Sequence, residues 1–357
     1  MLRLMLALIT PYYLPHIGGV EVHVANLARR LAKKYRTIII SSKPSKADYQ
    51  IKSLQVPYSP IPMYFPKVKA EIYHSHVPSP FFALKADEVA KEIKAYHIIT
   101  YHNDVVVPER VDGLSIPNFF GKIIEKYNEK IVLPLLERSD TVIATTRSYA
   151  ETSSVLSSVQ DKLEIVPNGV DTSVFTPSKN SKRNEVLYVG RLVEYKGLPH
   201  LIKAMKSVQA MEDVKLRIVG EGEDRRMFEE MCRRLEVRAE FTGRLSREGV
   251  IKAMREAKVL VLPSFSRLEA FGIVLLEAMA CGTPVIGANV PGVGEVAAKA
   301  GFVFESEEEL AELILSIIRD ETLVKKLGRR GRKVVEKEYS WDVVIKMVEK
   351  VYSKVVG

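Results

Sequence analysis

The chain has 357 residues, of which 46% are hydrophobic and 27% charged, and it carries a formal net charge of +9 at neutral pH. This length allows two domains of ordinary size, and the composition is that of a soluble globular protein. The two cysteines, Cys232 and Cys281, lie far apart without metal-ligand spacing, which argues against a disulfide framework and favours a reducing compartment.

All of the excess positive charge lies in the first fifth of the chain. Residues 1–70 contain eleven Lys or Arg and two acidic residues, whereas the remaining 287 residues contain 42 of each sign. Such a patch fits either an anionic surface, such as acidic lipid or a phosphorylated acceptor, or the solubilising surface of a thermophile protein. Abundant Lys, Arg and Glu with little Gln point to a thermophilic source. No nucleic-acid-binding motif accompanies the patch, so nucleic acid is not an expected partner.

Apolar, β-rich runs alternate with helical patterns along the whole chain, which predicts parallel sheets covered by helices. The first apolar run lacks a small-residue cleavage site, so we expect a buried strand and not a signal peptide. No run approaches the roughly 20 apolar residues of a membrane-spanning helix. In the first half we expect strands at 2–9, 37–41, 72–76, 98–102 and 141–145, and helices at 20–35 and at 118–138 with a kink at Pro134.

The same alternation restarts in the second half. The expected strands are 186–189, 216–219, 240–242, 259–262 and 284–286, and the expected helices are 225–235, 247–257 and a segment opened by the capping box Ser306–Glu309. The run VPNGVD (166–171) and the polar segment 171–184 mark the boundary between the halves. The predicted domains are therefore 1–172 and 173–338, followed by a C-terminal helix within 339–357.

Two glycines, Gly18 and Gly19, join the first strand to its helix. They permit close approach of the backbone to a phosphate or a sugar. Glu21 and His23 follow, and they either reach that ligand or open an amphipathic helix; for His23 the second interpretation is favoured.

Three further histidines occupy predicted strands of the first half. His102, followed by Asn103, stands at the carboxyl end of a strand, where ligands of parallel sheets bind and an imidazole can donate to a hydroxyl or stabilise charge. Alone, such a histidine is more often structural. His74 and His76 share one face of a strand, but a metal site needs a third ligand, which the sequence does not reveal. Strand-end packing or a minor acceptor contact is expected instead.

In the second half, Gly190 and Arg191 follow a strand, and Lys196 precedes the next helix. These cations project from the carboxyl edge of a parallel sheet, so together they can balance the roughly two negative charges of a diphosphate without a metal. Taken alone, the segment is more often a surface loop with exposed Arg and Lys.

The most informative segment runs from 263 to 286. Glu269 lies in a loop, and Glu277 lies eight residues later in a helix expected between Gly272 and Gly282. The free N–H groups at the helix start attract a phosphate, and Glu277 leans back toward that end. We therefore expect Glu269 to accept hydrogen bonds from hydroxyls of a sugar and Glu277 to accept them from hydroxyls of a ribose. A solvated Glu and an amphipathic-helix Glu are the alternative, which fits the apolar neighbours of Glu277 less well.

Other segments exclude competing functions. Gly220-Glu221-Gly222 lacks the third glycine of a dinucleotide fingerprint, since Arg225 occupies that position. No Walker A segment and no Asp-x-Asp pair occurs in the chain.

Together, the E-x7-E segment at 269–277, the run GRLVEYKG (190–197), VPNGVD, the glycine loop and His102 resemble family 4 of the retaining glycosyltransferases. The resemblance covers nearly the whole chain, although Pro291–Glu295 departs from the usual Gly-Gly-x-x-Glu run. It implies the GT-B fold, in which two Rossmann-like, doubly wound parallel-sheet domains face a central cleft. It also implies that the C-terminal helix crosses back to the first domain and that catalysis needs neither a metal nor a cofactor.

The resemblance assigns the site residue by residue. The implied catalytic residues are His102, Glu269, Arg191 and Lys196, and no residue is implied as a metal ligand. The implied donor-binding residues are Gly19, Gly190, Arg191, Lys196, Gly220, Arg244, Leu245, Glu269, Phe271, Gly272, Ile273 and Glu277. The implied acceptor-binding residues are Gly18, Gly19, His102 and Asn103.

The expected activity is transfer of a hexosyl group from a UDP- or GDP-linked sugar to a glycan or lipid-linked acceptor, in synthesis of cell-surface polysaccharide, glycolipid or glycoprotein glycans. The expected location is the cytoplasm, with peripheral association at the inner face of the membrane through residues 1–70. A non-catalytic nucleotide- or glycan-binding subunit of the same fold is the alternative, and a dehydrogenase ranks third. The sequence does not specify the donor sugar, its base, the acceptor, the linkage or the oligomeric state.

Overall fold

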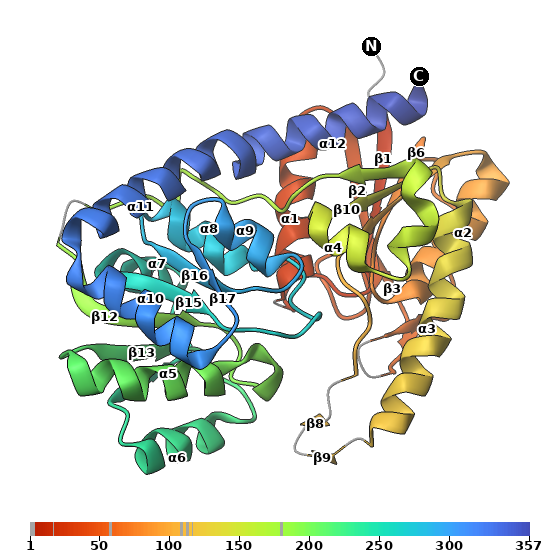
Figure 1. Ribbon diagram of the computed structural model, residues 1–357. Coiled ribbons are helices and arrows are strands. Elements are labelled where there is room, and N and C mark those ends of the chain that lie inside the picture. Colours follow the sequence, from red (N-terminus) through yellow and green to blue (C-terminus); the bar gives the residue numbers. More distant parts are fainter. Residues whose placement is uncertain are drawn as a thin grey trace. The chain divides into compact units, whose positions relative to one another are not determined.

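The computed structural model describes residues 4–16, 18–56, 59–107, 110–111, 114–115, 117–178 and 181–357. Residues 2 and 3 of the predicted first strand and residues 179–180 of the predicted boundary segment lie outside this set. The chain divides into two compact units (Figure 1). The N-terminal unit comprises Met1–Val107, Pro117–Asn168 and Asp342–Gly357, and the C-terminal unit comprises Pro108–Ile116 and Gly169–Trp341.

The N-terminal unit is built on a seven-stranded sheet with the order β11-β10-β7-β6-β1-β2-β3, in which every pairing is parallel. The strands are β1 (Met5–Ile9), β2 (Arg36–Ser42), β3 (Tyr49–Ile51), β6 (Ile72–Val77), β7 (Tyr96–Tyr101), β10 (Thr141–Ala144) and β11 (Leu163–Ile165). Its main helices are α1 (Gly19–Leu31), α2 (Pro80–Ile93), α3 (Asn118–Arg138) and α4 (Arg147–Thr152). Every residue of β6 is buried, as expected of a central parallel strand covered on both faces.

The C-terminal unit is built on a six-stranded parallel sheet with the order β14-β13-β12-β15-β16-β17. The strands are β12 (Arg183–Val189), β13 (Lys215–Val219), β14 (Ala239–Gly243), β15 (Ala257–Leu262), β16 (Val285–Ala288) and β17 (Phe302–Phe304). The helices are α5 (Leu198–Met211), α6 (Arg225–Leu235), α7 (Arg247–Glu256), α8 (Ile273–Ala280), α9 (Val293–Ala298), α10 (Glu307–Arg319) and α11 (Glu321–Val334).

Alternate residues of one strand fill two different cores in this unit. Val186 and Tyr188 of β12 pack with α5, α6 and α10, whereas Leu187 packs with α7 and α8 on the other face. Helices thus cover both faces of the sheet. The prediction of two doubly wound parallel sheets is confirmed.

Most element bounds agree with the predicted ones within a few residues. The helix predicted at 118–138 has those limits and contains Pro134. The predicted capping box is present, since Ser306 Oγ accepts from Glu309 N at 3.1 Å at the start of α10. The predicted strand at 98–102 ends one residue earlier, so His102 lies just beyond β7. No described helix has the length and apolar character needed to span a bilayer.

The last helix, α12 (Trp341–Val356), contributes residues 342–357 to the N-terminal unit. Its Tyr352 hydroxyl lies 2.7 Å from His74 Nδ1, and the Tyr352 ring meets Tyr35 edge-on at 5.8 Å. Lys354 and Glu164 form an ion pair of 2.6 Å near its end. These contacts attach the end of the chain to the sheet of the N-terminal unit.

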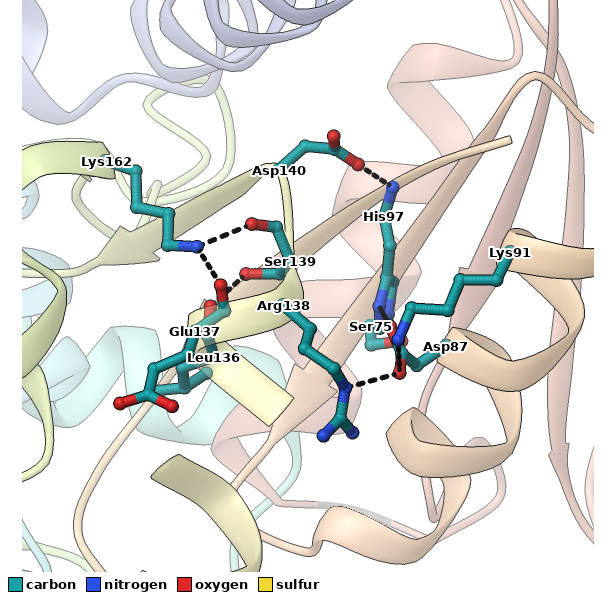
Figure 2. A network of polar contacts seen from close by, with 10 residues as sticks. All are labelled: Ser75, Asp87, Lys91, His97, Leu136, Glu137, Arg138, Ser139, Asp140 and Lys162. Carbon is teal, nitrogen blue, oxygen red and sulfur yellow. Dashed lines mark hydrogen bonds and ion pairs between the residues drawn. The ribbon is translucent and has the colours of Figure 1, made fainter. Parts of the chain in front are cut away.

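A polar network stabilises the amino end of the same sheet (Figure 2). The buried Asp87 carboxylate of α2 accepts from Arg138 Nε at 3.1 Å and Lys91 Nζ at 3.0 Å, and it lies 3.6 Å from His97 Nδ1. Burial alone would raise the pKa of Asp87, but His97, Lys91 and Arg138 hold it well below its usual range. His97 stands near the amino end of β7, and His102 follows its carboxyl end. The network and His102 therefore lie at opposite ends of the strands.

Candidate active site

In the C-terminal unit, the loops that follow β12, β13, β15 and β16 pack backbone against backbone. Gly220 has φ +140, and a Cβ there would lie 1.9 Å from the carbonyl oxygen of Gly190. Gly197 has φ +74, and a Cβ there would lie 2.0 Å from the carbonyl oxygen of Pro263. Both positions therefore require glycine, because a side chain has no space and the backbone conformation disfavours one. These two contacts hold the loops after β12, β13 and β15 together at the carboxyl edge of the sheet, where ligands of such sheets bind.

Lys196, Glu269 and the start of α8 are joined directly. The Lys196 ammonium pairs with the Glu269 carboxylate, whose other oxygen accepts from Gly272 N at 3.0 Å. Gly272 is the N-cap of α8 and has φ +78. One carboxylate thus connects a cation to a helix N-terminus across 73 positions of sequence.

Electrostatics keep Lys196 charged. Burial acts to lower the pKa of the Lys196 ammonium, but the neighbouring Glu269 carboxylate raises it, and the net shift is upward. The positive charge of Arg191 acts to lower the pKa of Lys196, so a second cation lies near the Lys196 ammonium. Arg191 is exposed, and its guanidinium has no ion-pair partner in the described part of the chain. The Tyr188 hydroxyl holds the loop by donating to the Arg191 carbonyl oxygen at 2.8 Å.

Glu277 lies four residues into α8, with a half-buried side chain. Desolvation raises the pKa of its carboxyl to about 7, and the charge of Arg247 only partly offsets this. Helical side chains lean toward the N-terminus, so this carboxyl is directed along α8 toward Gly272. A ligand with hydroxyl donors at that place would stabilise the ionised form.

The other predicted donor residues differ in what they present. Arg244 is exposed after β14, and Gly220 N donates to the Gly243 carbonyl oxygen at 3.0 Å, so that loop adjoins the site. Leu245 and Ile273 are half-buried and pack against the core. The Phe271 ring is buried in that core, 6.1 Å from the ring of Tyr339, so only the Phe271 backbone can face a ligand.

Sequence reasoning missed several residues that shape these loops. Ser264 is fully buried, and its hydroxyl donates to the Tyr195 carbonyl oxygen at 3.1 Å. Gly292 has φ +88, and a Cβ there would lie 2.0 Å from the carbonyl oxygen of Ala270. Of these two residues, only Gly292 could have been recognised from the sequence, because a glycine soon after a strand is typical of a close backbone contact.

In the N-terminal unit, Gly18 is the N-cap of α1 and Gly19 is its first residue. The Glu21 carboxylate turns back to this end, and a Cβ on Gly18 would lie 2.4 Å from Glu21 Oε2. Burial raises the pKa of Glu21, while His16, whose Nδ1 lies 3.2 Å from Glu21 Oε1, opposes the shift.

His102 has neighbours that the sequence did not indicate. Its Nε2 lies 3.1 Å from His76 Nδ1, and its ring meets that of His23 from α1 at 5.2 Å. All three histidines are buried. Desolvation lowers the pKa of His23 to about 4 and lowers the pKa values of His76 and His102 well below the ordinary range. Asn103 is half-buried, and its amide donates to the Asp104 carbonyl oxygen at 2.8 Å.

Two family models of known proteins match this chain. Residues 17–174 match the model of Glycosyltransferase Family 4, and residues 170–334 match that of Glycosyl transferases group 1. The chain belongs to the family 4 glycosyltransferases. The predicted family and enzyme class are confirmed.

Solved structures show the same fold for this glycosyltransferase. Sucrose-phosphate synthase from Thermosynechococcus elongatus superimposes with a TM-score of 0.79 at 21% identity, over 99% of each chain. Anabaena HepE in complex with UDP superimposes with a TM-score of 0.77 at 16% identity, over 98% of this chain and 100% of its own. The glycosyltransferase has the GT-B fold, as predicted.

Two similar sequences align over nearly their full length. The uncharacterized glycosyltransferase MJ1178 of Methanocaldococcus jannaschii is 28% identical, with 98% of this chain and 99% of its own covered. A phosphatidyl-myo-inositol mannosyltransferase of Mycobacterium tuberculosis is 27% identical, with 99% and 97% covered.

Proposed function

We propose that this glycosyltransferase is a retaining, metal-independent hexosyltransferase that uses a UDP- or GDP-linked sugar. The observation that carries the proposal is the contact of Lys196 with Glu269 and of Glu269 with the N-terminus of α8, beside the exposed Arg191. Two cations and a helix start at one sheet edge match a diphosphate. The HepE complex with UDP, on the same fold, is consistent with a nucleotide ligand.

The donor then occupies the C-terminal unit. Its diphosphate contacts Arg191, Lys196 and the backbone at Gly272, and its ribose hydroxyls donate to the ionised Glu277. Phosphate oxygens compete with Glu269 for the Lys196 ammonium, so donor binding releases the Glu269 carboxylate to accept from hydroxyls of the sugar. The ion pair of the free protein is therefore the resting arrangement of two ligand-binding groups.

Departure of the nucleoside diphosphate is the step that concentrates negative charge. Fixed cations act most strongly where charge develops, so Arg191 and Lys196 contribute mainly to the rate of transfer. The acceptor hydroxyl attacks the anomeric carbon on the face that the diphosphate leaves. The acceptor proton passes to an oxygen of the leaving phosphate, and the configuration is retained.

The N-terminal unit supplies the acceptor side, through Gly18, Gly19, His102 and Asn103. A neutral imidazole such as His102 donates from one nitrogen and accepts at the other, so it can orient a sugar hydroxyl. The M. tuberculosis relative is named for mannosyl transfer to phosphatidyl-myo-inositol, which is consistent with a lipid-linked acceptor for this chain as well.

A thermal-shift screen over UDP-, GDP- and ADP-sugars tests the donor site. We expect one UDP- or GDP-sugar to raise the melting temperature, and transfer or slow hydrolysis of that donor to persist in excess chelator. Activity abolished by the chelator and restored by manganese would contradict a diphosphate site built from protein cations alone. A shift without hydrolysis or transfer to any acceptor would instead favour a binding subunit.

Helix α3 indicates that the protein finds its acceptor at a membrane surface. The first turns of this helix expose several large apolar side chains. Phe119, Phe120, Ile123, Ile124 and Tyr127 are between 49% and 70% exposed. Their spacing places them on one side of the helix, and Lys122, Lys126 and Lys130 form an exposed stripe alongside. An apolar face edged by lysines is typical of a helix that lies in the surface of an acidic membrane.

We therefore expect the protein to sediment with vesicles containing acidic lipid and less with neutral vesicles. Changing Phe120 and Ile123 to Ser should reduce binding several-fold, whereas Met211→Ser, at an exposed apolar position of the C-terminal unit, should not. Charge reversal at Lys43 and Lys52 tests the basic region of residues 1–70 in the same assay. Equal binding to neutral and acidic vesicles would refute a role for charge.

A further inference from the structure

The three histidines around His102 converge from separate elements of the N-terminal unit: His23 from α1, His76 from β6 and His102 from the segment after β7. One ligand nitrogen from each lies within 4.8 Å of the others. Across the described residues, this is the single group of three or more His, Cys, Asp or Glu side chains close enough to hold one ion.

The spacing of the rings matches that of imidazoles on a tetrahedral metal ion. With Zn–N bonds of about 2.0–2.1 Å, two imidazole ligands have ring centroids about 5.2 Å apart and nitrogens about 3.4 Å apart. The observed centroid distances are 5.2 Å between His23 and His102, 5.3 Å between His76 and His102, and 5.6 Å between His23 and His76. The facing nitrogens of His76 and His102 are 3.1 Å apart.

Neighbouring side chains fix the orientation of these rings, as the neighbours of metal-binding histidines usually do. His74 stacks on His76 at 4.5 Å and is itself fixed by the hydroxyls of Tyr352 and Thr100, each 2.7 Å away. The Asn168 side chain interacts with His23 and opposes the desolvation that lowers the pKa of this histidine. Such partners orient ligand imidazoles and increase metal affinity.

His76 also retains an unused donor or acceptor. Its Nε2 is buried without a hydrogen-bond partner in the described part of the protein. A buried polar atom without a partner is unfavourable, so hydrogen bonds within the described protein do not saturate this cluster.

We propose that His23, His76 and His102 form a binding site for a divalent transition-metal ion, with Zn²⁺ the ion that fits best. Three imidazoles leave one position open, which water fills in zinc sites of this kind. Imidazole also binds Co²⁺, Ni²⁺ and Cu²⁺, but not Mg²⁺ or Ca²⁺, which prefer oxygen ligands. The ion is not needed for transfer, since the diphosphate contacts lie in the C-terminal unit.

Cobalt spectroscopy tests the site directly. Protein stripped of metal with a chelator is titrated with Co²⁺; we expect one equivalent to produce the intense visible bands of four-coordinate cobalt, and one equivalent of Zn²⁺ to remove them. His23→Gln and His76→Gln should each weaken binding tenfold or more, whereas His200→Gln, at a half-buried histidine of the C-terminal unit, should leave it unchanged. Weak binding that the His23 and His76 variants do not alter would overturn the proposal.

A second measurement does not depend on the folding of variants. X-ray absorption of the zinc-loaded wild-type protein should show three imidazole nitrogens at about 2.0–2.1 Å. A shell of oxygen ligands without imidazole would overturn the proposal equally.

A functional consequence rests on the role proposed for His102. If His102 contacts the sugar, Zn²⁺ should inhibit transfer at the concentration that removes the cobalt bands. Bands without inhibition would count against that role and leave the metal site standing. Inhibition without bands would count against the metal site and leave the proposed transfer activity standing.

Discussion

Changing Lys196 to Ala is expected to lower transfer at saturating donor by a factor of about 10²–10⁴ while the C-terminal unit remains folded. The ammonium is held at the sheet edge by Glu269 and remains charged, so it is positioned to stabilise the leaving diphosphate. Its removal takes away a charge that matters most in the transition state, so kcat should fall more than KM rises. Steady-state kinetics over a donor range, with a thermal melt of each variant, measure both effects.

Lys203→Ala is the matched control. Lys203 is half exposed on α5, and its ammonium pairs with Glu307 at 2.8 Å, so its loss removes an equal charge and an ion pair away from the loops of the site. Its kinetic constants should stay near those of wild type. If Lys196→Ala also turns over near normally, then the Lys196–Glu269 pair is structural and the catalytic role is wrong. Adding Glu269→Gln to the Lys196→Ala variant should restore none of the rate that Lys196→Ala loses, because the second change adds no cation.

The affinity for donor is expected to fall as pH drops below about 7, approaching tenfold per pH unit, because the Glu277 carboxyl must be ionised to accept from ribose hydroxyls. Its pKa is raised to about 7 by burial, with Arg247 opposing and Cys281 the other titratable neighbour. Donor binding at pH 6–7 should therefore release up to one proton. Calorimetry in buffers of different ionisation enthalpy measures this release.

In Glu277→Gln, donor binding should be about 10- to 100-fold weaker at pH 8 and nearly independent of pH, since hydrogen bonds to a charged acceptor contribute about 1.5–3 kcal/mol. Without donor, the same variant should be more stable than wild type at pH 8 by about 1–3 kcal/mol. A carboxyl whose pKa is higher in the folded than in the unfolded state costs stability as pH rises from about 4.5 to about 7. Glu312→Gln, at an exposed position of α10, should change neither property. If the affinity of the wild-type protein for donor does not change between pH 6 and 8, the proposed contact between Glu277 and the ribose is wrong.

Much of this architecture could be predicted because the physical signals are local. Continuous apolar runs such as Val259–Leu262 form central strands, since a parallel sheet covered by helices has no polar face. The start of α8 after Gly272 and its end near Gly282 were likewise visible, because both glycines allow the left-handed backbone that the helix boundaries require. Arg191, Lys196 and Glu269 were assigned to one sheet edge because they follow the carboxyl ends of parallel strands.

Other features could not be predicted because they depend on distances between distant segments. The pairing of Lys196 with Glu269 and the backbone contact of Gly220 with Gly190 join different loops. Phe271 was assigned to the donor site, but the sequence could not show that its ring packs in the core and leaves only its backbone to face a ligand, because a residue beside a motif can point to either side of its loop. His23 was expected to be an ordinary helix residue, and only the packing of α1 on the sheet brings it to His102.

By itself, the sequence determined the two parallel α/β sheets, the family and the chemical types gathered at each sheet edge, because periodicity, glycine positions and strand ends act through neighbours along the chain. Only the tertiary structure decided which charges touch, which carboxyl is desolvated and which histidines converge. Those properties arise from exclusion of water and from contacts between segments tens of residues apart, and no local pattern records them.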